Sequence, residues 1–346
     1  MSKAAELAAL IGSQTALSNR NLIINGEMEI SQRGTTFADL ANGGFCVDRF
    51  IIFHSDDGAV TVSQDTTVPA GQGFKNSMKF DVTTADTSIG AAQFYQFAQK
   101  IEGQNMAHLE WGTSNAKSVT LSFWIRSNVT GTYNVYFLNN AVNRYHPVNF
   151  TIDSADTWEK KIITVAGDTT GTWLTTNGVG MFVLWNLAIG SDYLTGTNAT
   201  WGTAGPAVSG TTQANFLSST SNELYITGVQ LEEGDVATAF EHEDYTTTLT
   251  KCRRYYQYLT GNQYYGGFWA YTGSTSVYVQ LVPSMRAAPT VTNYNVRNGS
   301  SGATASNQAA NYGGIDGFNC PIDGSGGSDT HFSHINQAYL EASAEL

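Results

Sequence analysis

Charged side chains are scarce in this sequence. Asp, Glu, Lys and Arg make up 13% of its 346 residues, about half the usual share for a globular domain. Thr, Ser, Asn, Gly and Tyr supply the polar surface instead, and β-branched and aromatic residues fit a pleated sheet. The composition is poor for helices, which favour Ala, Leu, Glu, Lys and Arg. We therefore expect an all-β protein, and its length predicts two domains with a short accessory segment.

Positive charge and long apolar runs are also scarce. The sequence has 17 Lys and Arg residues against 29 Asp and Glu residues, a net charge of −12. An acidic surface repels phosphate backbones, so no nucleic-acid partner is expected. The most apolar stretch, 179–189, is too short to span a bilayer and contains Asn186. The first ten residues lack the apolar core of a signal peptide, so neither membrane insertion nor secretion is indicated.

Cysteine is rare and is not arranged for metal binding. The three cysteines, Cys46, Cys252 and Cys320, are far apart and include no CxxC pair. This pattern indicates neither a zinc knuckle nor a disulfide framework, and we expect buried free thiols. His331 and His334 form an HxxH without a nearby cysteine, and we interpret them as surface histidines. No cofactor is expected, although oxygen ligands are plentiful enough for a structural calcium ion.

Catalytic motifs are absent as well. The sequence contains no GxSxG elbow, HExxH helix or P-loop. The acidic pairs at 56–57 and 232–233 consist of chain neighbours, which point to opposite faces of a strand. The charged segment 241–244 is interpreted as a solvated turn. We expect no enzymatic activity, and a carboxylate pair assembled across strands is the alternative that the sequence leaves open.

A short amphipathic segment begins the chain. The apolar residues that recur at helical spacing there are Leu7, Leu10, Ile11 and Leu17. A helix of about two heptads is marginal alone in water, so we expect it to pack against copies of itself or against a host structure. Residues 1–19 are therefore predicted to be an attachment and oligomerisation helix. The alternative is a frayed tail.

Short strands with turns between them fill most of the remaining chain. The clearest alternation runs through 118–126, where every second residue is apolar. An NG pair at 25–26 between two strand-like runs predicts a hairpin. Regular strand spacing predicts a jelly-roll β-sandwich over 20–248, and a renewed strand pattern predicts a smaller C-terminal β domain over 249–346. A long polar loop, 190–221, interrupts the first domain, and such loops are often functional.

Aromatic residues are abundant, with 17 Tyr, 17 Phe and 7 Trp. Many lie in strands and are core residues by default. Others lie in loops rich in Gly, Asn and Thr, and these candidate glycan-binding residues are Tyr193, Trp201, Tyr264, Tyr265 and Trp269. Such rings can stack on the apolar face of a sugar while amides bond its hydroxyl groups. The alternative is that they pack a subunit interface.

Three stretches that follow one another along the chain carry a family resemblance. They are NLIINGEMEISQRG (21–34) with VDRF (47–50), SFWIRSNVTGTYNVYF (122–137), and ITGVQLEEGDVATAFEHEDY (226–245) leading into KCRRYYQYL (251–259). Together they resemble phage tail-fibre-like virion proteins of marine and cyanobacterial phages, over about residues 20–290. The resemblance implies a jelly roll similar to carbohydrate-binding modules, a virion location and a homotrimer.

Several residues in these stretches have structural interpretations. Gly228 suits the close approach of a neighbouring backbone, and Gly234 suits the turn that ends its strand. Phe240 is expected to tuck back under the sandwich. The charges of Asp48 and Arg49, at the start of a core strand, are expected to be paired.

Three hypotheses for the function follow. The first is a tail-fibre or receptor-binding protein that attaches to phage tail or other virion proteins by its N-terminus and contacts host-surface polysaccharide. The second is a structural virion component, such as a head fibre, decoration protein or tail adaptor. The third, a glycan depolymerase, is disfavoured because the short repeating coil of a β-helix is missing.

Overall fold

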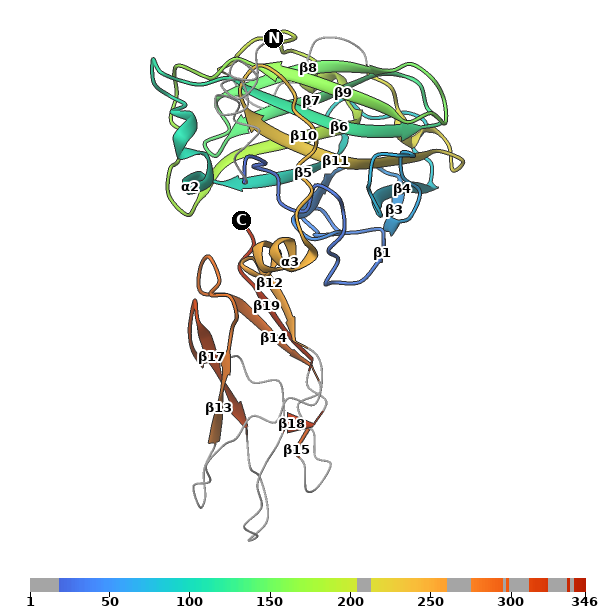
Figure 1. Ribbon diagram of the computed structural model, residues 1–346. Coiled ribbons are helices and arrows are strands. Elements are labelled where there is room, and N and C mark those ends of the chain that lie inside the picture. Colours follow the sequence, from blue (N-terminus) through green and yellow to red (C-terminus); the bar gives the residue numbers. More distant parts are fainter. Residues whose placement is uncertain are drawn as a thin grey trace. The chain divides into compact units, whose positions relative to one another are not determined.

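The computed structural model describes residues 19–203, 213–259, 275–294, 297–298, 311–322, 335–336 and 339–346. Contacts within the chain divide it into two compact units, Met1–Tyr245 and Thr246–Leu346 (Figure 1). The predicted residues that lie outside the described ranges are Leu7, Leu10, Ile11, Leu17, Tyr264, Tyr265, Trp269, His331 and His334. The attachment helix therefore stays a prediction.

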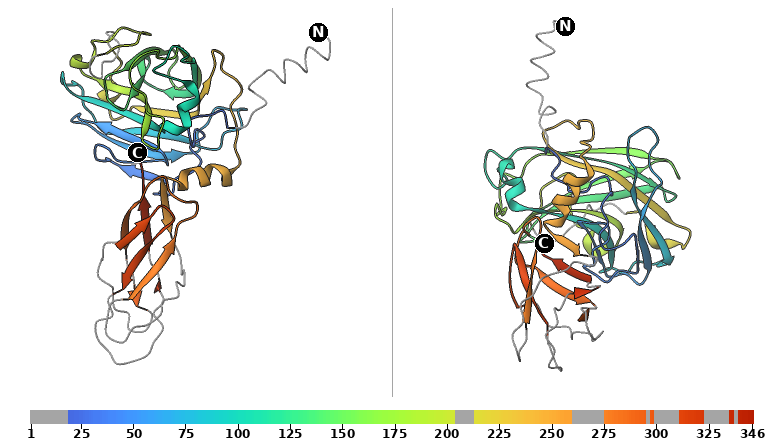
Figure 2. Two further views of the ribbon diagram at one scale, coloured as in Figure 1. Left: turned by 90° about the vertical axis from the view of Figure 1, so that its left-hand side faces the viewer. Right: turned by 60° about the horizontal axis from the view of Figure 1, so that its bottom comes forward.

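Unit 1 is a sandwich of two antiparallel sheets, drawn as facing layers in Figures 1 and 2. The six-stranded sheet contains, in spatial order, β1 (Thr36–Ala38), β3 (Ala59–Asp65), β4 (Ser77–Thr84), β11 (Glu223–Glu233), β6 (Val119–Ser127) and β9 (Glu159–Val165). The five-stranded sheet contains β2 (Phe50–His54), β5 (Phe94–Glu102), β10 (Val179–Ile189), β7 (Gly131–Asn139) and β8 (Tyr145–Ile152). The two sheets confirm the expected all-β sandwich.

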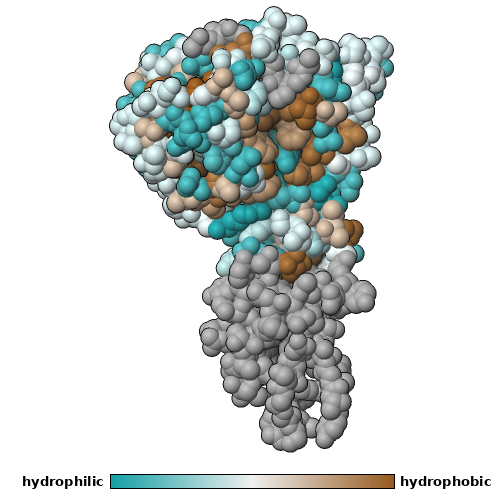
Figure 3. Space-filling view, turned by 180° about the vertical axis from the view of Figure 1, so that it is seen from behind, coloured by the Kyte–Doolittle hydropathy of each residue, from teal (hydrophilic) through white to brown (hydrophobic). Residues whose placement is uncertain are grey.

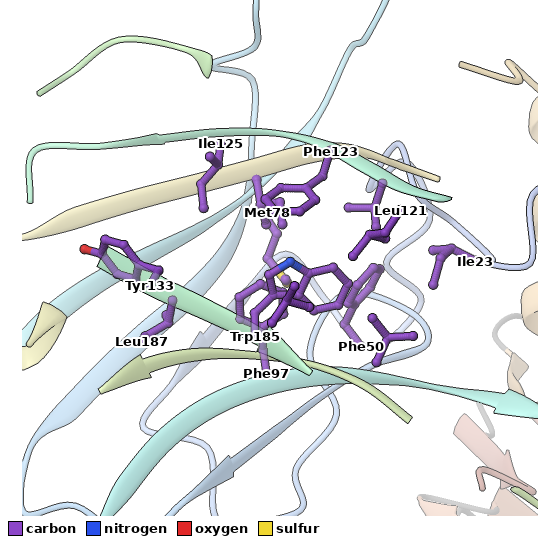
Figure 4. Packing of buried hydrophobic residues seen from close by; sticks show 14 of the residues in the cluster. Ile23, Phe50, Met78, Phe97, Leu121, Phe123, Ile125, Tyr133, Trp185 and Leu187 are labelled. Atoms are coloured by element: carbon purple, nitrogen blue, oxygen red, sulfur yellow. The ribbon is translucent and has the colours of Figure 1, made fainter. Parts of the chain in front are cut away.

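The core lies between the two sheets because each strand alternates its side chains. On β6 the apolar residues Leu121, Phe123 and their period-two neighbours are fully buried, as the sequence predicts. On the facing sheet, Trp185 stacks on Phe97 with ring centroids 5.0 Å apart. Phe123 meets the Trp185 ring edge-on at 5.8 Å. Figure 4 shows these side chains filling the space between the sheets.

The long polar loop is partly held against the edge of the five-stranded sheet. The connections between the strands of unit 1 contain short helices, which are α2 (Gly103–Met106), η2 (Ala107–Leu109), η3 (Ser191–Tyr193) and η4 (Phe216–Ser218). Gly202 exchanges two backbone hydrogen bonds with Tyr145 of β8, at 2.8 and 3.3 Å, and Ala199 donates to Pro147 at 2.7 Å. These bonds cover the outer edge of β8, which would otherwise present unpaired backbone groups.

The hairpin predicted at the NG pair is wrong. The structure forms a turn there, but no strands flank it between residues 21 and 34. Asn25 is buried, and its side chain accepts from Ile30 N and donates to Ile30 O, both at 2.9 Å, while also donating to Asp48 O at 3.0 Å. The amide of Asn25 therefore satisfies backbone groups that a hairpin ladder would have paired.

Position 26 requires a glycine because a side chain there would collide with the backbone of β11. A Cβ atom at Gly26 would lie 2.1 Å from the carbonyl oxygen of Val229, a backbone atom that cannot easily move. We expect Gly26→Ala to lower the free energy of unfolding of unit 1 by about 1–3 kcal/mol, measured by urea denaturation. Gly178→Ala is the matched control, because its Cβ would meet side-chain atoms and no backbone atom, namely the end of Leu174 at 3.2 Å and the Thr176 hydroxyl at 3.7 Å. Equal losses in the two variants would contradict this explanation.

The other structural expectations have mixed outcomes, and the one for Gly228 is wrong about what approaches it. Gly228 has a φ of +61° at a bulge of β11, and a Cβ there would meet the Phe74 ring at 2.5 Å, so a side chain and not a backbone approaches it. Phe240 packs edge-on against Phe74 at 5.0 Å. Asp48 accepts from the backbone N–H of Gln32 at 2.8 Å, and the Arg49 guanidinium donates to Lys100 O at 2.8 Å.

Unit 2 is also mostly antiparallel sheet. One three-stranded sheet contains β12 (Tyr256–Leu259), β19 (Tyr339–Ser343) and β14 (Thr290–Tyr294), and a second contains β13 (Thr275–Gln280), β17 (Gly317–Ile322) and β16 (Asn311–Gly314). The strands β15 (Arg297–Asn298) and β18 (Ile335–Asn336) form a short pair. The last strand, β19, is the central strand of its sheet.

A helix that was not predicted from the sequence begins at the last residue of unit 1 and continues into unit 2. The helix α3 (Tyr245–Arg253) includes a run of threonines, which are weak helix formers because their β-branched side chains are restricted. Its buried residues Thr248 and Cys252 indicate that packing, rather than intrinsic propensity, stabilises it.

Candidate functional site

The outer face of the five-stranded sheet is unusually apolar. Along β10, Met181 and Val183 belong to the core, so Phe182 and Leu184 point to the opposite side. An antiparallel sheet with one solvated face usually alternates apolar and polar residues. Here a second hydrophobic cluster covers the outside, consisting of Ile51, Ala98, Tyr136, Leu138, Tyr145 and Leu184, with Phe45, Phe53, Phe182, Ile189 and Tyr193 packed on it.

This face contains a groove with a volume of about 260 Å³. Its lining residues are Asn42, Phe53, Phe94, Gln96, Tyr136, Leu138, Val142, Phe182, Leu184, Ile189 and Tyr193. Seen from behind in Figure 3, the sandwich presents a gathering of hydrophobic residues bordered by hydrophilic ones. Apolar concave sites with a few polar groups are the usual form of small-molecule sites, so we take the groove as the candidate functional site.

Tyr193 is the predicted glycan-binding residue that the structure brings into the groove. It ends η3, and its ring meets Phe94 edge-on at 5.5 Å. Its hydroxyl donates to Ala92 O at 3.3 Å. These contacts fix the ring against the end of β5, so the long loop contributes to the groove through Tyr193.

The phenylalanines of the groove were missed by sequence reasoning. Phe53, Phe94 and Phe182 lie within strands, where aromatic residues are core by default. The signal that could have found them is the run through β10, in which both faces are apolar. The Lys100 ammonium lies over the Phe53 ring at 5.6 Å and the Phe182 ring at 5.5 Å. These cation–π contacts place a positive charge beside the two rings.

Side-chain amides extend from the groove across the same face. Gln96 lines the groove, and its cross-strand neighbour on β10 is Asn186. Asn186 lies opposite Asn134 on β7, which lies opposite Asn149 on β8. The four amides therefore form a row across four strands, which we call the amide row. Amide groups can bond the hydroxyl groups of a polar ligand.

Trp201 lies outside the groove, in a cluster of aromatic rings. It is half-buried, and its centroid lies 5.3 Å from that of Trp111, 5.6 Å from that of Trp173 and 4.9 Å from that of His146. Its indole N–H donates to Ala166 O at 2.9 Å. The structure thus gives Trp201 a packing position that anchors the polar loop, and it does not bring Trp201 together with Tyr193.

A buried ion pair supports the tryptophan cluster. Arg144 donates to both carboxylate oxygens of Asp168, from Nε and Nη2, at 2.6 Å each. Burial alone would raise the pKa of Asp168, but hydrogen bonds from Arg144 and Thr170 and the charge of Arg144 outweigh it, and the pKa lies below its ordinary value. Burial lowers the pKa of the neighbouring His146 to about 4. Arg144, Asp168 and His146 therefore form a polar cluster that packs against Trp173 and Trp201.

The acidic pairs singled out in the sequence are used within the fold. Asp56 accepts a hydrogen bond from Gly58 N at 2.9 Å, and burial raises its pKa. Glu232 is buried and accepts from Thr238 N at 2.8 Å. In the charged segment, His242 Nδ1 lies 3.0 Å from a carboxylate oxygen of Glu27. These contacts give the acidic residues structural roles.

Within the described residues, no group of three or more His, Cys, Asp and Glu side chains is placed to hold a metal ion. Over the same part of the chain, no helix has the length and apolar character needed to cross a membrane. Cys46 and Cys252 are buried free thiols, as expected. Burial raises the pKa of Cys46 to about 12.

Comparison with known proteins gives only distant likenesses. No family model matches the chain, and no curated protein matches it. The enzymatically active domain of tailspike protein 4 of bacteriophage CBA120 is 13% identical with a TM-score of 0.33, over 62% of this chain and 22% of the tailspike. A putative sugar-binding protein of Bacteroides thetaiotaomicron is 14% identical with a TM-score of 0.34, over 62% of this chain and 100% of that protein. A family 11 carbohydrate-binding module of Clostridium thermocellum is 12% identical with a TM-score of 0.29, over 60% of this chain and 99% of that module.

Proposed function

We propose that this protein is a non-enzymatic, carbohydrate-binding component of a phage particle, and that its groove contacts host-surface glycan. The observation that carries the proposal is that aromatic rings line the groove together with the amide of Gln96. The rings are those of Phe53, Phe94, Phe182 and Tyr193. Rings offer apolar faces for stacking on a sugar, while amides bond its hydroxyl groups. The structural contacts of the acidic pairs support a binding role over a hydrolytic one.

The virion part of the proposal is supported by the sequence. The ordered stretches within residues 21–259 resemble phage tail-fibre-like proteins. A tail-fibre or receptor-binding protein would hold the particle through residues 1–19 and present unit 1 to the host. A homotrimer would present three grooves, which raises avidity without any new contact.

The second candidate is a structural virion component in which the groove is a protein interface. Leu138, Val142, Leu184 and Ile189 favour this candidate, because they give part of the groove an aliphatic lining. Interface cores are richer in apolar and aromatic residues than the remaining surface. Labelling the protein on intact particles separates the candidates, because a position on the capsid away from the tail favours a decoration protein.

The proposed function predicts that the full chain binds bacterial surface glycans. We expect selective binding to one glycan class on an array of capsular polysaccharides and lipopolysaccharide O-antigens, without release of shortened products. A lectin of known specificity on the same array is the positive control. Absence of binding to every polysaccharide, with the lectin positive, would contradict the carbohydrate-binding proposal. Release of shortened products would revive the depolymerase hypothesis.

A further inference from the structure

The amide row has a direction. Asn186 donates from Nδ2 to Asn134 Oδ1 at 3.2 Å, and Asn134 donates from Nδ2 to Asn149 Oδ1 at 3.1 Å. Each donor therefore points away from β10 and toward β8. Neighbouring hydrogen bonds with a common direction polarise and strengthen one another, and in this direction the row uses Nδ2 of Asn186 and not its Oδ1.

This direction leaves one acceptor at the start of the row. Asn186 is 1% exposed, and its Oδ1 has no hydrogen-bond partner in the part of the chain that the structure describes. An acceptor buried without a partner costs about 1–3 kcal/mol, and such groups are uncommon in native proteins. The oxygen is therefore suited to receive a hydrogen bond from a ligand.

Gln96 presents a hydrogen-bond donor beside this acceptor. It lines the groove at 8% exposure, and its Oε1 accepts from the Tyr136 hydroxyl at 2.8 Å. The group that Gln96 offers to a ligand is therefore its NH₂, which is a donor. Gln96 and Asn186 are directly paired across β5 and β10, so their Cβ atoms lie about 4.5–5.5 Å apart.

We propose that Gln96, which lines the groove, and its buried cross-strand neighbour Asn186 form a hydroxyl-recognition pair. This inference rests on the proposed carbohydrate-binding function. A sugar hydroxyl donates its hydrogen to Asn186 Oδ1 and accepts a hydrogen bond from the Gln96 NH₂, because a hydroxyl is both donor and acceptor. An ionised carboxylate offers only acceptors, so the pair selects a hydroxyl over a carboxylate at this position. Because Asn186 is covered in this structure, we expect neighbouring side chains to shift as the hydroxyl enters.

An NMR titration of the full chain tests the pair directly. The probes are tetrasaccharides of glucose, xylose, galactose and N-acetylglucosamine. The signals followed are the side-chain amides of Gln96 and Asn186 together with the rings of Phe53 and Phe182. We expect a neutral probe to shift both sets of signals at the same concentration. Replacing one hydroxyl of that probe by hydrogen is expected to weaken its binding about tenfold or more, because leaving a buried polar group unpaired costs about 1–3 kcal/mol.

The variant Gln96→Met keeps the side-chain length and removes the donor. We expect it to bind the hydroxylated probe about tenfold more weakly and to bind the deoxy probe like the wild type, which is the coupling that a double-mutant cycle measures. Gln280→Met, an exposed glutamine of unit 2, is the matched control.

Three outcomes would overturn the pair. Shifts of the ring signals without shifts of the two amides would leave the groove as a sugar site and exclude the pair. A response to the N-acetylglucosamine probe alone would assign the amides to an acetamide group instead of a hydroxyl. If no probe shifts either set of signals, the pair fails as a site for these neutral sugars, whereas the carbohydrate-binding proposal fails only if the polysaccharide array is negative as well.

Discussion

Replacing Phe53 and Phe182 together by alanine is expected to weaken glycan binding by at least about 100-fold. Each ring lines the groove, and burying a large apolar side chain contributes about 1.5–3 kcal/mol. Two rings therefore account for more than the 2.7 kcal/mol or so that separates affinities by 100-fold. The affinity is measured by isothermal titration calorimetry with the glycan that the array identifies.

The double substitution should leave unit 1 folded, because both rings are on the outer cluster and not in the main core. Ile162→Ala is the matched control: Ile162 lies on the six-stranded sheet and is 56% exposed. It should bind glycan like the wild type. Circular dichroism and thermal melting confirm that each variant is folded. A folded double variant with wild-type affinity would exclude the groove as the glycan site.

The same variant distinguishes the interface alternative. If the groove packs against another subunit or virion protein, removing two large rings weakens that contact, because buried aromatic residues are typical anchors of interfaces. Sedimentation would then show smaller assemblies, while glycan binding would be unchanged. Under the carbohydrate-binding proposal the reverse is expected, with unchanged sedimentation and lost binding.

The fold could be predicted from the sequence because it depends on periodicity. The alternation through β6 identifies which side chains face the core, and turn residues separate the strands at regular spacing. The NG pair was misleading because Asn25 has a second use for its amide, which bonds Ile30 and Asp48. That use depends on contacts across 23 residues, which a local hairpin rule does not consider.

The groove was harder to predict because it depends on which strands are neighbours. Phe53 and Phe182 are 129 positions apart in the sequence, and both contact the outer cluster only because β5 lies between β2 and β10. Tyr193 was found from its loop setting, yet Trp201 has the same setting and a different surrounding. Trp201 meets Trp111 and Trp173, and neither partner is close to it in the sequence.

Asp168→Ala is expected to lower the free energy of unfolding of unit 1 by about 3–5 kcal/mol. The substitution removes a carboxylate that is 2% exposed and leaves the Arg144 guanidinium, itself 11% exposed, without its partner. It also removes one acceptor of the Trp173 indole N–H, which lies 3.2 Å from Asp168 Oδ2 and 3.3 Å from Thr170 O. Urea denaturation at neutral pH measures the loss. The matched control is Asp153→Ala, because Asp153 is 71% exposed in its ion pair with Lys161, and exposed pairs contribute about 0.2–1 kcal/mol.

The loss should also depend on pH in a defined direction. Because the pKa of Asp168 is lower in the folded state than its ordinary value, the unfolded chain takes up a proton first as the pH falls. The contribution of Asp168 is therefore complete above its unfolded pKa of about 3.9 and disappears as the pH falls through the lower folded pKa. Below that pH the carboxyl is neutral in both states, so the stability difference between wild type and Asp168→Ala should narrow. A difference that stays constant from neutral pH into this acid range would mean that the lost packing, and not the charge, stabilises the tryptophan cluster.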